Sequence, residues 1–464
     1  MTYGSGLGTW SRLLGAWAAI VVTVGCNGSQ PLTPSGSGGS GGATGGRAGG
    51  SGGATGGATG AGGTSAGGTG GTTFTEPFGS NVDILMMIDN SSSMIQMQQK
   101  LYAQLPLFIQ SLQSLPSPPS LHLAVVSSDM GAPGDSASSI GCTVLGDQGE
   151  FQSAPRSNSN LNPPVTCTDT TITPVLGAQD SDHTFITDAD MMPNYTDPIG
   201  TVLQCIALLG DTGCGFEHQL ASIDRALGAD GQFPGTNAGF LRPNAYLVIV
   251  MLTNEDDCSA PANTELYSLN GDMQNIANPL GPIANYRCNQ WGHLCTDPGT
   301  GQVEMPPLTP PSDAQGTSTA PTLDLTNCTS NDTTSGLLTP VAKFVSDIKA
   351  LKPDPDKQII VASIAAPATP YTVLWLPPSG GQSTKPGELW PELEHSCGPK
   401  GGDDVNPEAT QNPTDESFGD PAVRITQFVQ AFPNGVQGSI CDLSFATTMN
   451  AVASKIGQLI GAQP

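Results

Sequence analysis

Two stretches of the chain are apolar at almost every position. Residues 82–88 have the sequence VDILMMI, and residues 245–253 have the sequence AYLVIVMLT. A strand with one exposed face would alternate apolar and polar residues, so these runs are typical of strands buried on both faces. Such strands occur mainly in parallel sheets that helices cover on both sides. We therefore expect an α/β domain.

Further apolar runs alternate with segments of helical periodicity, which is the pattern of α/β order. The sequence predicts strands at residues 83–88, 121–129, 245–253, 358–366 and 435–440. It predicts helices at residues 95–115, 199–208, 217–227, 341–351, 423–431 and 445–460. Together they indicate a doubly wound, mainly parallel sheet flanked by helices.

Three long insertions interrupt this pattern, at about residues 130–187, 256–337 and 367–419. They are polar and rich in proline or glycine. A structureless loop as long as the second would be unusual in a compact domain, and it holds four cysteines, so we expect a disulfide-stapled subdomain there. Residues 74–464 are thus interpreted as one α/β domain with three insertions.

The first 26 residues resemble an export signal. Arg12 is followed by an apolar segment, residues 13–24, that is too short to span a bilayer as a mature helix. The ending TVGC resembles the lipobox of bacterial lipoproteins, which implies a lipidated Cys26 as the new first residue. A plain secretory peptide is the alternative. The resemblance predicts an exported protein of the bacterial cell envelope, at the outer membrane, that contacts the membrane through a lipid anchor only.

Residues 27–73 consist mainly of Gly, Ser, Ala and Thr, with near-repeats such as GGATGG. Such a segment has little apolar area to bury, so we expect a flexible tether.

Cysteine usage also indicates export. The chain has 11 cysteines, and those other than Cys26 form an even set, as disulfides require. They are Cys142, Cys167, Cys205, Cys214, Cys258, Cys288, Cys295, Cys328, Cys397 and Cys441. Short separations favour pairs of Cys205 with Cys214 and of Cys288 with Cys295. No CxxC spacing of the kind that binds zinc is present.

The formal net charge of −25 argues against nucleic acid or anionic lipid as a partner, because no basic stripe is present to neutralise phosphates. It agrees with solubility outside the cell and with affinity for divalent cations.

Asp89, Ser91 and Ser93 form a DxSxS motif directly after the first strand. The carboxyl ends of strands are where open α/β sheets bind ligands. Carboxylate and hydroxyl oxygens suit a hard cation such as Mg²⁺: the two hydroxyls can face one ion while the acid holds a coordinated water. The alternative is that these residues cap the following helix.

With this motif the chain resembles the von Willebrand factor A family, whose metal-ion-dependent adhesion site begins with DxSxS at the end of the first strand. The resemblance implies a doubly wound sheet with Mg²⁺ or Mn²⁺ at its top. It also implies an open coordination position for a carboxylate of a protein or glycan partner, and a role in adhesion or assembly. Asp89, Ser91 and Ser93 match the family motif residue by residue.

Two other loops of the family site depart from its pattern. A threonine is normal before the helix that precedes the fourth strand, and Thr212 in GDTGCGFEHQL is the nearest candidate. An acid normally follows the threonine that ends the central strand, but here Thr253 is followed by Asn254. Either Asn254 contributes its carbonyl oxygen, or Glu255 or Asp256 reaches the ion through water. The alternative for this NEDD segment is a solvated helix cap, and metal binding could be weak or lost.

The chain also resembles exported bacterial lipoproteins that share this module, through the segments GCGFEHQL and EDDCSAP. Cys214 and Cys258 would then lie near the same end of the sheet. This resemblance suggests that Cys214 pairs with Cys205 and that Cys258 pairs with Cys288.

No catalytic residue is predicted. The histidines occur singly, and no HExxH, GxSxG or phosphate-loop motif is present. The preferred hypothesis is metal-dependent binding of a partner by a non-enzymatic surface lipoprotein. A metal-independent envelope scaffold that binds through the disulfide-rich insertions is the second hypothesis, and a secreted hydrolase with a scattered site is the third.

Overall fold

The computed structural model describes residues 79–132, 142–156, 184–187, 193–267, 279–281, 286–317, 320–377, 388–398 and 417–461. These residues belong to a compact unit, Phe74–Pro464, that is separate from Met1–Thr73. The predicted signal, Cys26, the predicted tether and most of the first insertion, with Cys167, lie outside the described residues.

The main sheet has six strands in the order β12-β9-β4-β1-β2-β3. They are β1 (Asn81–Ile88), β2 (Ser120–Ser127), β3 (Ile186–Thr187), β4 (Tyr246–Leu252), β9 (Ile359–Ala365) and β12 (Gly435–Ser439). All neighbours are parallel except β2 and β3, which are antiparallel. The predicted α/β domain with a mainly parallel sheet is confirmed.

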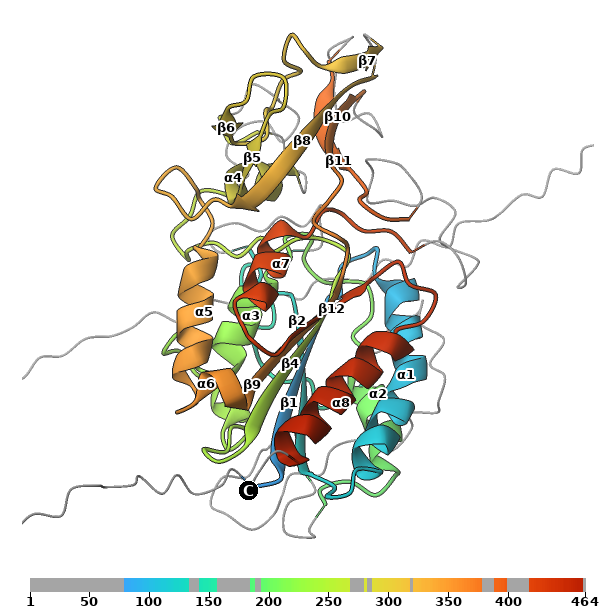
Figure 1. Cartoon of the computed structure of the whole chain (residues 1–464). Helices are drawn as coiled ribbons and strands as arrows, with labels where there is room; N and C mark the ends of the chain where they lie inside the picture. The colour runs from blue at the N-terminus through green and yellow to red at the C-terminus, as the bar shows by residue number, and fades with distance from the viewer. Residues whose placement is uncertain are drawn as a thin grey trace, which may run out of the picture. The chain divides into compact units, whose positions relative to one another are not determined.

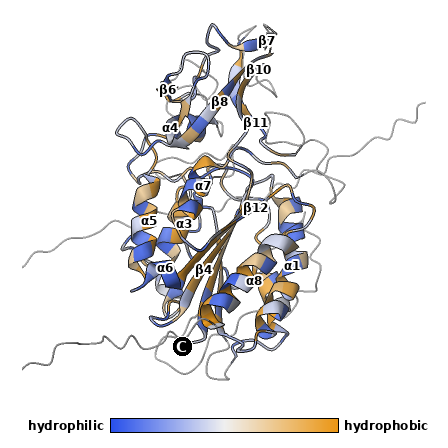
Figure 2. Cartoon of the chain, in the orientation of Figure 1, coloured by the Kyte–Doolittle hydropathy of each residue, from blue (hydrophilic) through white to orange (hydrophobic). Residues whose placement is uncertain are grey.

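Helices cover both faces of this sheet (Figure 1). One face carries α1 (Ile95–Gln113), α2 (Ile199–Ile206) and α8 (Ala446–Gly461), and the other carries α3 (Gln219–Ala226), α5 (Val341–Ala350) and α7 (Val423–Gln430). Ile84 and Met86 of β1 pack on the first face, and Leu85 and Met87 pack on the second. Both faces are therefore apolar, and β4 is hydrophobic along its length in Figure 2.

A second, antiparallel sheet has the order β11-β10-β8-β5-β6, and β7 also pairs with β8. Its strands are β5 (His293–Thr296), β6 (Val303–Glu304), β7 (Gln315–Thr317), β8 (Ala320–Ser330), β10 (Tyr371–Leu376) and β11 (Trp390–Glu394). Strands β5 to β8 come from the second insertion, and β10 and β11 come from the third. The second insertion is therefore not a subdomain by itself: it shares a sheet and a core, which includes Trp375, with the third.

Among the described residues, two further α-helices and the 3-10 helix Gly235–Asn237 are short. Helix α4 (Tyr286–Gly292) leads directly into β5, and α6 (Pro355–Gln358) leads into β9. Among the described residues, no helix combines the length and the apolar character that crossing a membrane requires.

Disulfides join segments that are distant in sequence. The pairs are Cys142–Cys214, Cys258–Cys288, Cys295–Cys328 and Cys397–Cys441, and Cys205 is also disulfide-bonded. The expected pairing of Cys258 with Cys288 is confirmed. The expected pairs of Cys205 with Cys214 and of Cys288 with Cys295 are wrong. Cys288 belongs to α4 and Cys295 to β5, so these sequence neighbours meet different partners. The bonds indicate an oxidising compartment.

We expect Ile249→Ala to lower the free energy of unfolding by about 2–5 kcal/mol, because the side chain is fully buried in the centre of β4 and truncation leaves a cavity. The matched control is Leu443→Ala, since Leu443 is 77% exposed, with an expected change within about 0.5 kcal/mol. Urea unfolding of both variants measures the difference. Equal losses would contradict this placement of β4.

A second prediction concerns Asp224 on α3, which is buried 3.6 Å from Lys343 Nζ on α5. Burial raises the pKa of this carboxyl to about 7, against the opposing charge of Lys343. An acid with a higher pKa in the folded state loses folding stability as the pH rises from its unfolded value to its folded one. We therefore expect Asp224→Asn to gain stability relative to the unmodified chain between about pH 4 and pH 8. Urea unfolding across this range measures the gain. The control is Asp442→Asn, because Asp442 is exposed. A difference in stability between Asp224→Asn and the unmodified chain that does not change with pH would contradict the prediction.

Candidate functional site

Asp89 lies where three neighbouring parallel strands end. Its backbone N–H donates to Leu252 O at 2.9 Å and so extends the pairing of β1 with β4 by one residue. Its carboxylate is fully buried. Oδ1 accepts hydrogen bonds from Ser91 N at 2.9 Å and Ser128 Oγ at 3.1 Å, and Oδ2 accepts one from Thr253 Oγ1 at 2.7 Å. The ends of β1, β2 and β4 thus converge on one acid.

A row of polar groups continues from Asp89. Ser91 Oγ lies 3.5 Å from Ser93 Oγ, and Ser93 Oγ lies 3.0 Å from Nδ2 and 3.3 Å from Oδ1 of Asn254. Ser91 and Asn254 are buried, and Ser93 is half-buried. The structure therefore brings together four of the residues predicted from the sequence: Asp89, Ser91, Ser93 and Asn254.

The serines do not cap the following helix. The N-cap residue of α1 is Met94, and no side chain donates or accepts a hydrogen bond at this cap. Among the described residues, the hydrogen bonds from the motif to the start of the helix use backbone oxygens of the motif: Ser91 O accepts one from Met94 N at 3.2 Å, and Asp89 O accepts one from Gln98 Nε2 at 2.7 Å. The alternative in which the motif caps the following helix is therefore wrong.

The electrostatic surroundings of Asp89 favour a cation. Burial is the largest effect on this carboxyl and raises its pKa. The groups that oppose the rise are Ser91, Thr253 and Ser128, which are all neutral hydrogen-bond donors. A positive charge next to a buried carboxylate would stabilise its ionised form.

The loop that carries Thr212 lies against the motif. Gln98 Nε2 donates to the backbone oxygens of Asp89 and Gly210 at 2.7 and 2.8 Å, and so joins the two loops. The side chain of Thr212 is exposed. The structure thus brings the backbone of this loop to the motif, but it does not place the Thr212 hydroxyl in the row of polar groups.

Asn90, inside the motif, has a buried side chain that makes no hydrogen bond with the described residues. Gly213 N donates to Asn90 O at 2.8 Å, and a Cβ on Gly213 would lie 2.3 Å from Asn90 Oδ1, so only glycine allows this approach. Neither Oδ1 nor Nδ2 of Asn90 has a partner among the described residues. Buried amides are normally paired, so this one marks a place for a water molecule or a ligand.

Asp256 lies outside this group. Its Oδ2 accepts hydrogen bonds from His293 Nε2 at 2.8 Å and Arg424 N at 2.7 Å, and its Oδ1 accepts one from Ile425 N at 3.1 Å. Burial acts to raise its pKa, but the hydrogen bonds from His293 and Arg424 and the charge of Arg424 outweigh burial and lower the pKa. The carboxylate is engaged at the start of α7 and does not face the serines.

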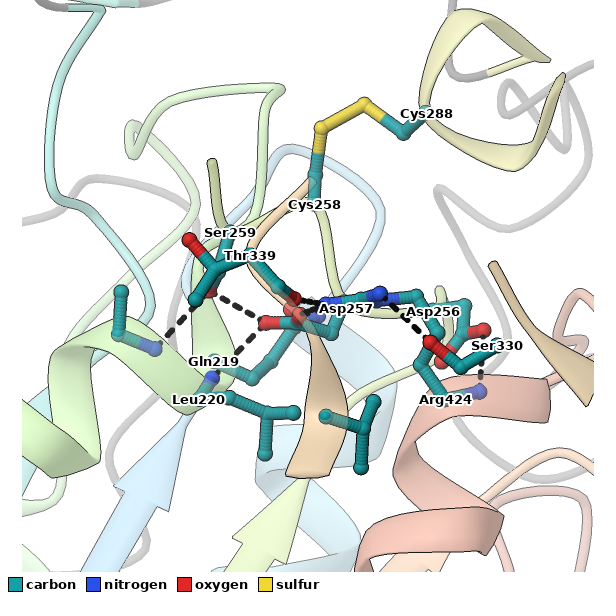
Figure 3. Close-up of polar contacts among 12 residues, drawn as sticks. Gln219, Leu220, Asp256, Asp257, Cys258, Ser259, Cys288, Ser330, Thr339 and Arg424 are labelled. Atoms are coloured by element: carbon teal, nitrogen blue, oxygen red, sulfur yellow. Dashed lines mark hydrogen bonds and ion pairs between the residues drawn. A yellow bond between two sulfur atoms is a disulfide. The ribbon is translucent and has the colours of Figure 1, made fainter. Parts of the chain in front are cut away.

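Asp257 likewise accepts a hydrogen bond from a backbone N–H group at the start of a helix, in this case α3 (Figure 3). Its Oδ1 accepts hydrogen bonds from Leu220 N at 2.9 Å and Ser259 Oγ at 2.6 Å, and its Oδ2 accepts one from Arg424 Nη2 at 2.9 Å. Asp256 and Asp257 of the NEDD segment therefore do cap helices. They are buried, however, so the expectation of a solvated cap is wrong.

Arg424 extends this network to a third helix. Its guanidinium is fully buried and donates to Ser330 Oγ at 2.9 Å and Thr339 O at 2.7 Å (Figure 3). Ser330 Oγ donates to Asp332 Oδ1 at 2.6 Å, and Asp332 accepts the backbone N–H groups of the first two residues of α5 at 3.0 and 3.2 Å. Helices α3, α5 and α7 are thus all held at their N-termini by carboxylates of one network.

Two buried histidine–aspartate pairs connect the two sheets. His293, at the start of β5, contacts Asp256, and His395, directly after β11, contacts Asp420 Oδ1 through Nδ1 at 2.8 Å. Burial, the largest effect, raises the pKa of Asp420. Asp420 N also donates to Asn254 O at 2.8 Å. Sequence reasoning missed these pairs, because isolated histidines carry no local motif.

The residues around Asp89 fit a hard cation. Their hydroxyl, carboxylate and amide oxygens are ligands that suit Mg²⁺ or Mn²⁺. The 3.5 Å between the serine oxygens compares with roughly 3 Å between adjacent ligands of an octahedral Mg²⁺. Within the described part of the chain, no group of three or more His, Cys, Asp or Glu could hold a metal.

No profile of a known protein family and no curated protein sequence matches this chain.

We expect Asp257→Ala to lower the free energy of unfolding by about 3–5 kcal/mol, because Arg424 would keep a buried charge without its carboxylate partner. The control is Asp347→Ala, which removes an ion pair with the half-exposed Lys343, with an expected loss of about 0.5 kcal/mol. Urea unfolding of both variants measures the losses. A loss for Asp257→Ala no greater than that of the control would contradict the role of this network.

Proposed function

We propose that this chain is a von Willebrand factor A-like module that binds Mg²⁺ or Mn²⁺ through Asp89, Ser91 and Ser93, and through the ion a carboxylate of a protein or glycan partner. The observation that carries the proposal is the buried Asp89 carboxylate, whose hydrogen-bond partners are neutral, beside two serine hydroxyls that do not cap the helix.

The topology of the main sheet supports this proposal. Numbered within that sheet alone, its strands have the order 6-5-4-1-2-3, which is the order of a classic doubly wound sheet. From β1 the strand order proceeds toward one edge of the sheet through β2, and from β4 it proceeds toward the other edge, so the order reverses between β1 and β4. Ligands bind at the carboxyl ends of strands at such a reversal. The residues after β1 and β4 are those that carry Asp89 and Asn254.

Four residues of the chain would hold the ion. Ser91 and Ser93 would offer hydroxyl oxygens, Asn254 a carbonyl oxygen and Asp89 a negative charge, acting through water because its oxygens already accept three hydrogen bonds. The bound ion would supply a Lewis-acidic position for the carboxylate of the partner. Thr212 remains a candidate, on a loop that already contacts the motif.

The proposed setting is the bacterial cell surface. The disulfides favour an oxidising compartment, and the sequence of the first 73 residues favours a lipidated Cys26 followed by a tether. Such an anchor would leave the module free to reach partners beyond the membrane surface.

A metal-independent scaffold is the second candidate. It is favoured by the contact of Ser93 with Asn254, which satisfies the hydroxyl with a neutral amide. The antiparallel sheet, built from two insertions, would then provide the binding surface.

Titration of the oxidised chain with Mn²⁺, and separately with Mg²⁺, in a calorimeter tests the first candidate. We expect one saturable site, an affinity lower by about tenfold or more in Ser93→Ala, and loss of binding in Asp89→Asn. The control Ser111→Ala removes an exposed hydroxyl of α1 and should bind like the unmodified chain. Absence of binding by the folded, unmodified chain would favour the metal-independent scaffold.

A further inference from the structure

We propose that Asn254 makes metal binding depend on the partner: the site holds a divalent cation weakly by itself and tightly once an external carboxylate joins it. This inference rests on the proposed function, and it concerns how that function is regulated. It follows from the position of Asn254 and from the charges that reach the row of polar groups.

Asn254 is held at the site from two sides. The residue is 1% exposed, and the oxygen and nitrogen of its carboxamide both lie within 3.3 Å of Ser93 Oγ. Its backbone oxygen accepts a hydrogen bond from Asp420 N, and a Cβ on Gly419 would lie 3.0 Å from that oxygen. The segment before α7 thus fixes the backbone of Asn254, and the carboxamide stays beside the serine.

Asp89 supplies the negative charge of the site. Within the described part of the chain, the hydrogen bonds of Asp89, Ser91 and Ser93 include no second carboxylate. Asp256, two residues after Asn254, is engaged by His293 and the N-terminus of α7. A divalent cation would therefore leave the site with a net charge of +1, and an uncompensated charge in buried surroundings is costly.

An external carboxylate would neutralise this charge. The cation would thus attract the carboxylate, and the carboxylate would strengthen binding of the cation by the same factor, because coupling between two ligands is reciprocal. A carboxylate in place of the Asn254 carboxamide would supply the second negative charge from within the chain. Because Asn254 is neutral, the second negative charge comes from the partner.

The first experiment uses the unmodified, oxidised chain and Mn²⁺ as the probe. Calorimetric titrations are run in a large excess of acetate, and in acetamide with ionic strength matched by NaCl. Acetate offers the carboxylate of a partner without the rest of it, and acetamide is its neutral counterpart. We expect acetate to lower the dissociation constant of Mn²⁺ severalfold relative to acetamide.

The second experiment repeats both titrations with Asn254→Asp. We expect Mn²⁺ to bind on the order of tenfold tighter than to the unmodified chain in acetamide, because the new charge lies next to the ion. The gain from acetate should then shrink. The matched control is Ser111→Asp, which adds the same charge near the other end of α1, roughly 24 Å along the helix from its start, and should leave both constants nearly unchanged.

Two outcomes would overturn the inference while the metal site stands: an equal Mn²⁺ affinity of the unmodified chain in acetate and acetamide, or an acetate gain that is as large in Asn254→Asp. If Asn254→Asp does not fold, the comparison of acetate with acetamide on the unmodified chain decides alone. Absence of Mn²⁺ binding by the folded chain in every condition would instead refute the proposed function, and the inference with it.

Discussion

The buried ion pair between Asp257 and Arg424 is the interaction on which the carboxyl edge of the main sheet depends. Both side chains are fully buried, so each compensates a charge that would otherwise be costly. Asp257 also accepts the N–H of Leu220 in α3, and the backbone N–H of Arg424 in α7 donates to Asp256. Through Ser330 and Asp332 the network reaches α5. The three helices on one face of the sheet are therefore fixed at their N-termini by one network.

This network explains why an acidic segment contributes so little charge to the candidate site. The residues after β4 serve two different purposes: Thr253 and Asn254 contact the DxSxS motif, whereas Asp256 and Asp257 contact helix N-termini. Each acid is already satisfied by several donors, and withdrawing one would leave buried N–H groups unpaired. Among the hydrogen bonds of the described residues, Asp89 therefore supplies the only carboxylate in the group of Asp89, Ser91, Ser93 and Asn254.

The elements of the main sheet were predictable because their patterns are local: β4 was expected at residues 245–253 and spans Tyr246–Leu252. Asp89 and Asn254 were predictable because they follow strands that become neighbours. Ser128 follows β2 and could have been found by the same reasoning. The pairing of β8 with β10 could not, because β9 of the other sheet lies between them in sequence. Tertiary packing also decides which cysteines meet, so the pairs expected from short sequence separations were wrong.

The metal-bound and metal-free interpretations of the site use the same atoms. The serine hydroxyls do not cap α1, whose N-cap residue Met94 has no side-chain hydrogen bond, and they contact each other and Asn254. Neutral contacts satisfy these hydroxyls, but they leave the buried Asp89 carboxylate, if ionised, without a counter-charge. The buried carboxylate is therefore the feature that distinguishes the two interpretations: a bound cation would compensate its charge, whereas the neutral contacts do not.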